Sequence, residues 1–382
     1  MSANYNISET VEKNKMEKQI EATRYEELGV RPLINCIGTI TTLSGSLVLP
    51  EVRQAMAEAA KRYVRIDELM HGVGTRIAEI MDCEWALVTN GCAAALTQVS
   101  AACMAGTDPE KMGRLPDATN MKNEVIVQTT HRVGYDRAIT ATGAKLIEVS
   151  THAELEAAYS DQTAMLFIFG DAAERGEISV AEMSESGHRH GVPTLVDAAA
   201  ERPDRPNSYL EEGADAVAYS GGKCLRGPQA SGLILGRKSL LQAAFANGCP
   251  HGSIGRPMKV GKEEIMGLLA AVEQWVVRDH QSEWQEWERR LALIADAVAD
   301  FDSVRTSTQL PGRSNVTPTL SIHWDTAKLG IAPPDVRDQL SAGEPRIEVS
   351  GGAENIGINP YMMEDGEEIQ VAKRLSQILS AA

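Results

Sequence analysis

A lysine in a glycine-rich turn is the residue of this sequence that most directly suggests chemistry. Lys223 follows Gly221 and Gly222 and precedes Gly227 and Pro228, and apolar runs flank the whole segment. Glycine and proline are typical of turns, which hold side chains at the rim of a rigid scaffold. A lysine amine held there can form a Schiff base with an aldehyde such as pyridoxal phosphate. An ordinary hairpin lysine is the alternative interpretation.

Asp197 could complete a pyridoxal phosphate site. It directly follows the apolar run 194–196, and an aspartate that ends an apolar strand is costly to bury unless it meets a positive partner or caps a helix. A protonated pyridine nitrogen is such a partner, and the pairing keeps the ring an electron sink. Because Lys223 lies one strand-and-turn unit beyond Asp197, both side chains can reach the same crevice.

Two further segments predict a phosphate cradle and a stacking group. The turn Asn90-Gly91-Cys92 separates an apolar run from a helical segment, so its backbone amides can face an anion. Close packing of small residues is the alternative there. His131 follows the run 124–127, where its ring could lie flat over an aromatic ring or act as a hydrogen-bonding core histidine.

These residues need a scaffold that brings several strand ends together. Short β-rich runs alternate with segments of helical spacing, such as 93–104 and 151–159, which favours a mostly parallel sheet covered on both faces. Ligands of such sheets bind beyond the carboxyl ends of the strands. The expected strands are residues 86–89, 124–127, 145–149, 164–168, 194–196, 216–219 and 232–235.

The predicted division is a polar N-terminal arm of residues 1–30, a large domain of residues 31–275 and a small α+β C-terminal domain of residues 276–382. Apolar residues at helical spacing from 262 to 301 predict one long or kinked helix that leaves the large domain. The small domain should contain strands at 319–324 and 346–349 and close with an amphipathic helix at 366–379.

Composition excludes several classes of partner. The 382 residues are 43% apolar and can bury a large core, and 53 acidic against 37 basic residues give a net charge of −16, so nucleic acid is not an expected partner. No apolar run is long enough to span a membrane. Six cysteines without metal-type spacing, and no apolar signal core, favour the cytoplasm. His188 and His190 form an HxH pair at the end of a polar helix, and no metal site is expected there.

The motifs together resemble a known family. Residues 90–93, the Val-Asp-Ala-Ala-Ala segment at 196–200 and Ser-Gly-Gly-Lys-Cys-Leu-Arg-Gly-Pro-Gln at 220–229 are similar to fold type I pyridoxal phosphate enzymes of the selenocysteine synthase branch. The match is closest to the short members of the D-glucosaminate-6-phosphate ammonia-lyase type. It extends to residues 38–46, 106–109 and 255–263, and so covers most of residues 31–380.

The resemblance implies the aspartate aminotransferase fold and a role for each matching residue. Lys223 would bind the cofactor and then act as the base at Cα, Asp197 would pair with the pyridine nitrogen and His131 would stack on the ring. Asn90, Gly91, Cys92 and Ser220 would hold the phosphate. Such enzymes work as homodimers or higher homo-oligomers with shared active sites, so residues 256–262 would help from a neighbouring chain.

Two departures from the family bear on function. The long selenocysteine synthases carry an N-terminal module that grips transfer RNA, whereas here only about 30 polar residues precede the body. Cys92 stands where family members tend to carry alanine or serine, which leaves the cofactor prediction intact because backbone amides bind the phosphate. The selenium-transfer interpretation therefore loses most of its support.

The predicted activity is an α,β-eliminating ammonia-lyase acting on a β-hydroxy amino acid or an amino-sugar acid. Racemisation, transamination, aldol cleavage and transfer would use the same lysine and aspartate. A non-catalytic relative that only binds the cofactor is a further alternative. Each cation that could grip a substrate carboxylate or phosphate could equally form a surface ion pair. These candidates are Arg226, His251, Arg256, Lys259, Lys262 and Arg346.

Overall fold

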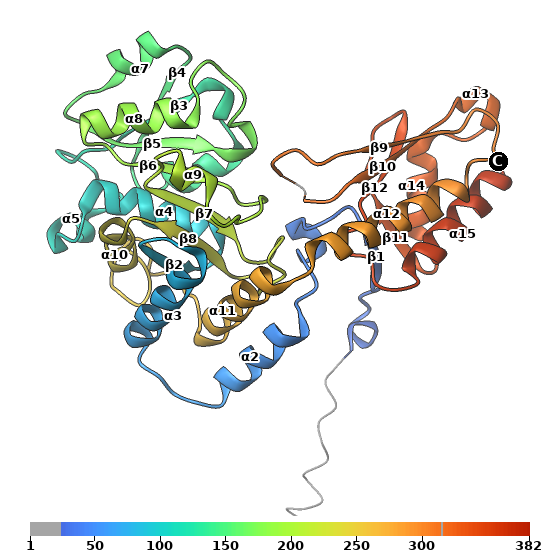
Figure 1. Ribbon diagram of the computed structural model, residues 1–382, viewed down its shortest axis with the longest axis horizontal. Helices are drawn as coiled ribbons and strands as arrows, with labels where there is room; N and C mark the ends of the chain where they lie inside the picture. The colour runs from blue at the N-terminus through green and yellow to red at the C-terminus, as the bar shows by residue number, and fades with distance from the viewer. Residues whose placement is uncertain (1–23, 315) are drawn as a thin grey trace, which may run out of the picture.

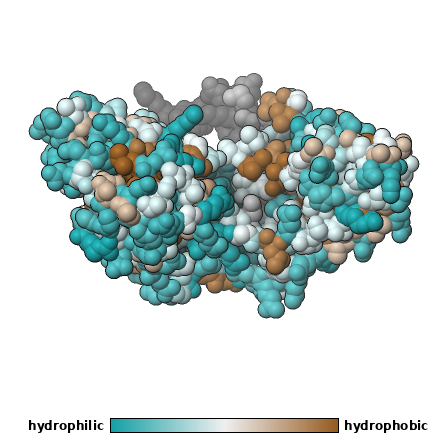
Figure 2. Space-filling view, turned by 90° about the horizontal axis from the view of Figure 1, so that it is seen from above, coloured by the Kyte–Doolittle hydropathy of each residue, from teal (hydrophilic) through white to brown (hydrophobic). Residues whose placement is uncertain are grey.

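The computed structural model describes residues 24–314 and 316–382, which fold around two separate hydrophobic cores (Figure 1). Most of the predicted arm lies outside these residues, and its described end contains a short 3-10 turn at Tyr25–Leu28. Figure 2 shows that one face of the molecule is largely hydrophilic with scattered apolar groups.

A seven-stranded sheet forms the centre of the larger unit. Its order is β2-β8-β7-β6-β5-β3-β4, and all neighbours are parallel except β8, which is antiparallel to both β2 and β7. The prediction of a mostly parallel sheet is confirmed, and each predicted run lies within a strand. The strands are β2 (Trp85–Thr89), β3 (Glu124–Gln128), β4 (Lys145–Val149), β5 (Thr163–Phe169), β6 (Thr194–Asp197), β7 (Ala216–Ser220) and β8 (Gly232–Gly236).

Helices bury the central strands of this sheet. The alanine-rich α4 contacts β2 and β5 to β8 and is itself buried along most of its length, because small side chains let a good helix former approach the sheet closely. The helix α8 packs on β5 and β6. The helices of this unit are α2 (Pro50–Ala60), α3 (Ile66–Met81), α4 (Gly91–Ala105), α5 (Pro109–Arg114), α6 (Arg137–Thr140), α7 (His152–Ala158), α8 (Val180–His190), α9 (Ser208–Glu211), α10 (Lys238–Ala246) and α11 (Lys262–Val277).

The smaller unit carries two small sheets. One is antiparallel, in the order β12-β10-β9, and the other is a parallel pair of β1 and β11. Its strands and helices are β1 (Leu33–Cys36), α12 (His280–Asp296), β9 (Arg305–Gln309), β10 (Thr319–His323), α13 (Thr326–Leu329), α14 (Pro333–Ala342), β11 (Arg346–Val349), β12 (Asn355–Ile358) and α15 (Glu367–Ser380).

One segment lies elsewhere than expected. Residues 33–36 were predicted to begin the large domain, but β1 pairs with β11 and its Ile34 and Cys36 belong to the core of the smaller unit. Nothing in the local sequence reveals a strand whose partner lies near the other end of the chain. From β1 in the smaller unit the chain therefore crosses to the larger unit and later returns (Figure 1).

The predicted long helix is broken into α11 and α12. Arg278 ends α11 in an extended conformation, with φ −64° and ψ 142°, and the Asp279 side chain accepts a hydrogen bond from the Ser282 amide to cap α12. The break places the Arg278 guanidinium 3.3 Å from the carbonyl oxygen of Cys224, next to Lys223. The connection between the two units thus touches the lysine turn.

No helix in the described ranges combines the length and apolar character that a bilayer crossing requires.

We predict that Gly74→Ala in α3 destabilises the protein by about 1–3 kcal/mol, because overpacking a tight core costs that much. A Cβ at Gly74 would lie 2.3 Å from the carbonyl oxygen of Ala86 and 2.8 Å from the Trp85 ring. Gly72 in the same helix has open space around it, so Gly72→Ala should instead stabilise by up to about 1 kcal/mol. Urea unfolding midpoints measure both effects, and equal midpoints for the two variants would contradict the packing argument.

Candidate active site

The predicted site residues follow strands whose carboxyl ends meet at one edge of the large sheet. Asn90, Gly91 and Cys92 follow β2, His131 follows β3, Asp197 and Ser220 end β6 and β7, and Lys223 comes directly after β7. Because β2, β3, β6 and β7 point the same way, this edge is where ligands of open parallel sheets bind.

The turn that carries Lys223 is held tightly by its own backbone. The Arg226 amide donates to the Lys223 carbonyl at 2.9 Å, and the Gly227 amide donates to the Gly221 carbonyl at 2.8 Å. A Cβ at Gly222 would lie 2.7 Å from the Cα of Gln229, so the close approach of the two backbone segments requires glycine there. The sequence therefore places the lysine on a rigid support.

Residues much later in the chain fix the residue that follows the lysine. Tyr361 Oη donates to the Cys224 carbonyl at 2.6 Å, and Arg278 donates to the same oxygen. The Cys224 thiol in turn donates to the Glu201 carbonyl at 2.9 Å. Contacts with distant segments thus help to fix the turn that carries Lys223.

Asp197 is a buried carboxylate with few partners. It is 2% exposed, and its Oδ1 accepts hydrogen bonds from the Cys92 thiol at 3.2 Å and from the Ala199 amide at 3.1 Å. Burial raises the pKa of Asp197, while these two hydrogen bonds and the nearby Lys223 charge act to lower it. Within the described part of the chain, no arginine, lysine or histidine forms an ion pair with Asp197.

The turn before α4 leaves helix amides available to an anion. Gly91 has φ +81°, a conformation that favours glycine, and the Asn90 side chain makes no cap to α4. Asn90 Nδ2 instead donates to the Lys259 carbonyl at 2.6 Å. On the neighbouring strand β8, a Cβ at Gly232 would lie 2.5 Å from the Gly91 carbonyl carbon, so a glycine keeps this turn in place.

His131 is buried and has one unused ring nitrogen. Its Nε2 lies 3.1 Å from the Arg175 carbonyl oxygen, and its Nδ1 has no hydrogen-bond partner within the described residues. Burial lowers the pKa of His131 and so favours the neutral ring; a proton on Nε2 is the arrangement that lets the Arg175 carbonyl accept, and Gln128 Nε2 lies 3.4 Å from the same nitrogen. Nδ1 is then a free acceptor.

These features fit pyridoxal phosphate. The group would supply a protonated ring nitrogen to the buried Asp197, a phosphate to the uncapped start of α4 and an aldehyde to the Lys223 amine. When bound, it acts as a sink for the electrons left when a bond to Cα breaks. The role of each residue in holding it stays a prediction.

The predicted substrate-binding cations lie in different places. Arg226 is close to the lysine turn, donates through Nε to the Leu47 carbonyl at 3.0 Å, and has a pKa lowered chiefly by burial. His251 lies between the Phe245 carbonyl and Asp67, at 2.9 and 3.4 Å. No described contact joins His251 to the Lys223 turn.

The other four predicted cations also lie at different places in the structure. Lys259 borders the phosphate turn through its carbonyl, and Arg256 is exposed with Nη1 3.7 Å from the Cys249 sulfur. Lys262 pairs with Glu263. Arg346 lies on β11 in the smaller unit, where Nε bonds Glu348 at 2.7 Å.

A small pocket beside Lys223 contains residues that sequence analysis missed. It lies where the two units meet, and its lining comes from chain segments far apart in the sequence. No local sequence pattern could have revealed this pocket, since each segment contributes only one or two residues of common types. The lining residues are Gly38, Thr39, Ala200, Cys224, Val316, Thr317, Asn359 and Tyr361.

Glu201 was also missed as a titratable group. It is 6% exposed, Oε2 accepts a hydrogen bond from Tyr209 at 2.7 Å, and Oε1 has no partner among the described residues. Burial raises the pKa of Glu201 to about 7. A Cβ at Gly170 would lie 2.1 Å from Oε1, so the carboxyl fills the space that a side chain at residue 170 would take. In the sequence, the feature that could have marked Glu201 as a site residue is its position four residues after Asp197.

The fold is that of the fold type I pyridoxal phosphate enzymes. The chain belongs to the aminotransferase class-V family, whose pattern matches residues 46–252. Proteins of this family use pyridoxal phosphate, which is therefore the cofactor of this chain. A solved structure of D-glucosaminate-6-phosphate ammonia-lyase matches 95% of this chain and 100% of its own with a TM-score of 0.84 and 30% sequence identity.

Curated relatives confirm the predicted resemblance and widen the range of reactions. D-glucosaminate-6-phosphate ammonia lyase of Salmonella typhimurium is 30% identical over 94% of this chain and 98% of its own. 5'-C-glycyluridine monooxygenase-decarboxylase of a Streptomyces species is 33% identical over 93% and 92%. L-seryl-tRNA(Sec) selenium transferase of Solidesulfovibrio magneticus is 26% identical over 91% and 82%.

We predict that Glu201 makes the apoprotein less stable as pH rises from about 4.5 to 7. The folded state holds the Glu201 proton more tightly than the unfolded chain, so stability is full below pH 4.5 and falls until the carboxyl is ionised above pH 7. The loss attributable to this group is at most about 3 kcal/mol. Glu201→Gln should flatten this part of the profile, measured by thermal unfolding from pH 4.5 to 8.

Glu211→Gln, on the exposed side of α9, is the matched control and should leave the profile unchanged. A Glu201→Gln profile that runs parallel to that of the parent protein would show that Glu201 has an ordinary pKa.

Proposed function

We propose that this enzyme is a lyase that removes a β-hydroxyl group from an amino acid or amino-sugar acid, such as D-glucosaminate 6-phosphate, and releases a 2-oxo acid and ammonia. The observation that carries the proposal is the grouping of Lys223, Asp197 and the turn before α4 at one sheet edge. Two named ammonia-lyase matches, in sequence and in structure, support this reaction over the others open to the cofactor.

Lys223 is assigned two tasks in this proposal. Its amine would hold the cofactor aldehyde and, once freed, would accept the Cα proton of the substrate. The β-hydroxyl would leave with a proton as water, and addition of one water would then release ammonia and the 2-oxo acid. The turn around Gly222 and the bonds to the Cys224 carbonyl keep the amine where it can serve both tasks.

Asp197 and His131 are assigned to the cofactor ring. A charged Asp197 holds the proton on the pyridine nitrogen, and burial strengthens this pairing because little water competes for it. His131 stacks on the ring, while the amides at Gly91 and Cys92, together with Asn90 and Ser220, hold the phosphate.

The substrate's anionic groups need local cations because the protein as a whole carries a charge of −16. Arg226, next to the lysine turn, is the first candidate for the carboxylate. Arg256 and Lys259, which lie on the segment bordering the phosphate turn, would serve a neighbouring chain's site in a homodimer or larger homo-oligomer. A cytoplasmic location remains part of the proposal.

An oxygen-dependent decarboxylation is the second candidate. It is favoured by the Streptomyces relative, which is as similar to this chain as the ammonia lyase is and is named a monooxygenase-decarboxylase. Both reactions use a cofactor-bound amino acid, and they differ in which bond to Cα breaks. Oxygen uptake and carbon dioxide release separate them.

We predict that the cofactor-loaded enzyme releases ammonia and 2-oxo acid in equal amounts from at least one substrate in a panel of D- and L-β-hydroxy amino acids and phosphorylated amino-sugar acids. Lys223→Ala should lower the rate at least about 10²-fold, because a positioned base contributes that much. It should also abolish the borohydride-fixed cofactor label at residue 223. Lys238→Ala, at the start of α10, should change neither.

Several results would overturn this proposal. Appearance of the opposite enantiomer without ammonia indicates a racemase, and oxygen uptake with carbon dioxide release indicates the decarboxylase. A protein that binds the cofactor at Lys223 but turns over nothing in the panel would favour a non-catalytic relative.

A further inference from the structure

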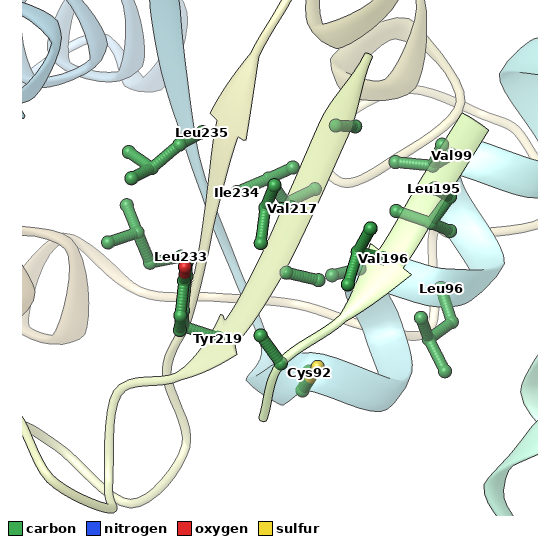
Figure 3. Packing of buried hydrophobic residues seen from close by; sticks show 14 of the residues in the cluster. Cys92, Leu96, Val99, Leu195, Val196, Val217, Tyr219, Leu233, Ile234 and Leu235 are labelled. Atoms are coloured by element: carbon green, nitrogen blue, oxygen red, sulfur yellow. The ribbon is translucent and has the colours of Figure 1, made fainter. Parts of the chain in front are cut away.

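The Cys92 side chain contacts the carboxylate that is assigned to the cofactor's ring nitrogen. Cys92 lies at the start of α4, beside the end of β6, and its sulfur is visible there in Figure 3. The thiol is 3.2 Å from Asp197 Oδ1, and both side chains are buried, with 9% and 2% exposed. Sequence analysis considered only the backbone amide of this residue.

The two donors to Asp197 leave the carboxylate with one side occupied. The Cys92 thiol and the Ala199 amide both bond Oδ1, and no hydrogen bond to Oδ2 occurs within residues 24–314 and 316–382. A carboxylate can rotate about its bond to Cβ unless its oxygens are held. With Oδ1 held on two sides, Oδ2 is the oxygen that can face a cationic ligand.

Cys92 remains a donor throughout the physiological range. Burial and the neighbouring Asp197 raise the pKa of the thiol well above its ordinary value, so the proton stays on sulfur. The hydrogen bond favours the ionised form of Asp197, against the effect of burial. An ionised Asp197 is the form that a protonated pyridine nitrogen requires.

We propose that Cys92 is a positioning residue for the cofactor ring: its thiol holds Asp197 Oδ1 so that Oδ2 is presented, ionised, to the pyridine nitrogen. This proposal rests on the assignment of Asp197 to that nitrogen. One residue then links the two ends of the cofactor site, since its amide lies in the phosphate turn and its side chain bonds the ring-nitrogen partner.

A packing role is the competing explanation. Cys92 belongs to the large hydrophobic core, and its removal would leave a small void whatever its thiol does. A void should have the same effect whatever residue stands at position 197, whereas the positioning role requires an ionised carboxylate there, which asparagine lacks. A double-mutant cycle separates the two explanations.

The experiment measures the dissociation constant of pyridoxal phosphate from the apoprotein and the pH dependence of the bound cofactor's visible absorbance. The variants are Cys92→Ala, Cys92→Ser, Asp197→Asn and the double variant Cys92→Ala with Asp197→Asn. Cys103→Ala, a half-buried thiol in the same helix, is the matched control.

Cys92→Ala should weaken cofactor binding about 3- to 10-fold, the effect of one lost hydrogen bond, and should shift the midpoint of the absorbance titration. Cys92→Ser keeps a donor and should restore both properties most of the way. In the Asp197→Asn background, removal of the thiol should have little further effect. Cys103→Ala should match the parent protein.

The outcomes distinguish this proposal from the one it rests on. If Asp197→Asn leaves affinity and spectrum unchanged, the assignment of Asp197 is wrong. If Asp197→Asn changes both but Cys92→Ala changes neither, or changes them equally in both backgrounds, the positioning role of Cys92 is wrong and the residue only packs.

Discussion

The burial of the Asp197 carboxylate is the constraint on which the rest of the site depends. A charge placed 2% exposed at the end of an apolar strand is unfavourable unless other groups compensate for the lost water. The protein supplies two hydrogen bonds and the nearby charge of Lys223, and no ion pair from the described residues. In the proposed function the cofactor's ring nitrogen is the missing cation, which would couple cofactor binding to the local stability of this strand end.

The same reasoning explains why the lysine turn is held from two sides. The two tasks proposed for Lys223, holding the cofactor and accepting a proton, would need a fixed backbone for its flexible side chain. The Cys224 carbonyl, next to Lys223, accepts hydrogen bonds from Tyr361 and Arg278, which both follow the large sheet's last strand in the sequence. The break between α11 and α12 is therefore part of the site's construction, because an uninterrupted helix would not place Arg278 at this carbonyl.

Sequence reasoning recovers the features that are local. The strand runs, the glycine turn at Lys223 and the position of Asp197 follow from periodicity and from residues with special backbone requirements, and each lies where expected. What it misses depends on distant partners. The pairing of β1 with β11, the thiol of Cys92 against Asp197 and the unpartnered oxygen of Glu201 are set by packing between segments far apart in the chain.

The contrast between local features and long-range packing also explains why the cofactor is easier to infer from the sequence than the reaction. The residues proposed to bind pyridoxal phosphate follow β2, β3, β6 and β7 of one sheet, whereas the small pocket beside Cys224 is lined by residues far apart in the sequence, such as Thr39, Thr317 and Asn359. The bond that breaks is the one held perpendicular to the cofactor ring, and that orientation depends on how the rest of the substrate is held. Changes at a few substrate-contacting positions can thus redirect the chemistry while the sheet edge stays the same. Relatives of 30% and 33% identity that carry the names of different reactions are what such an arrangement allows.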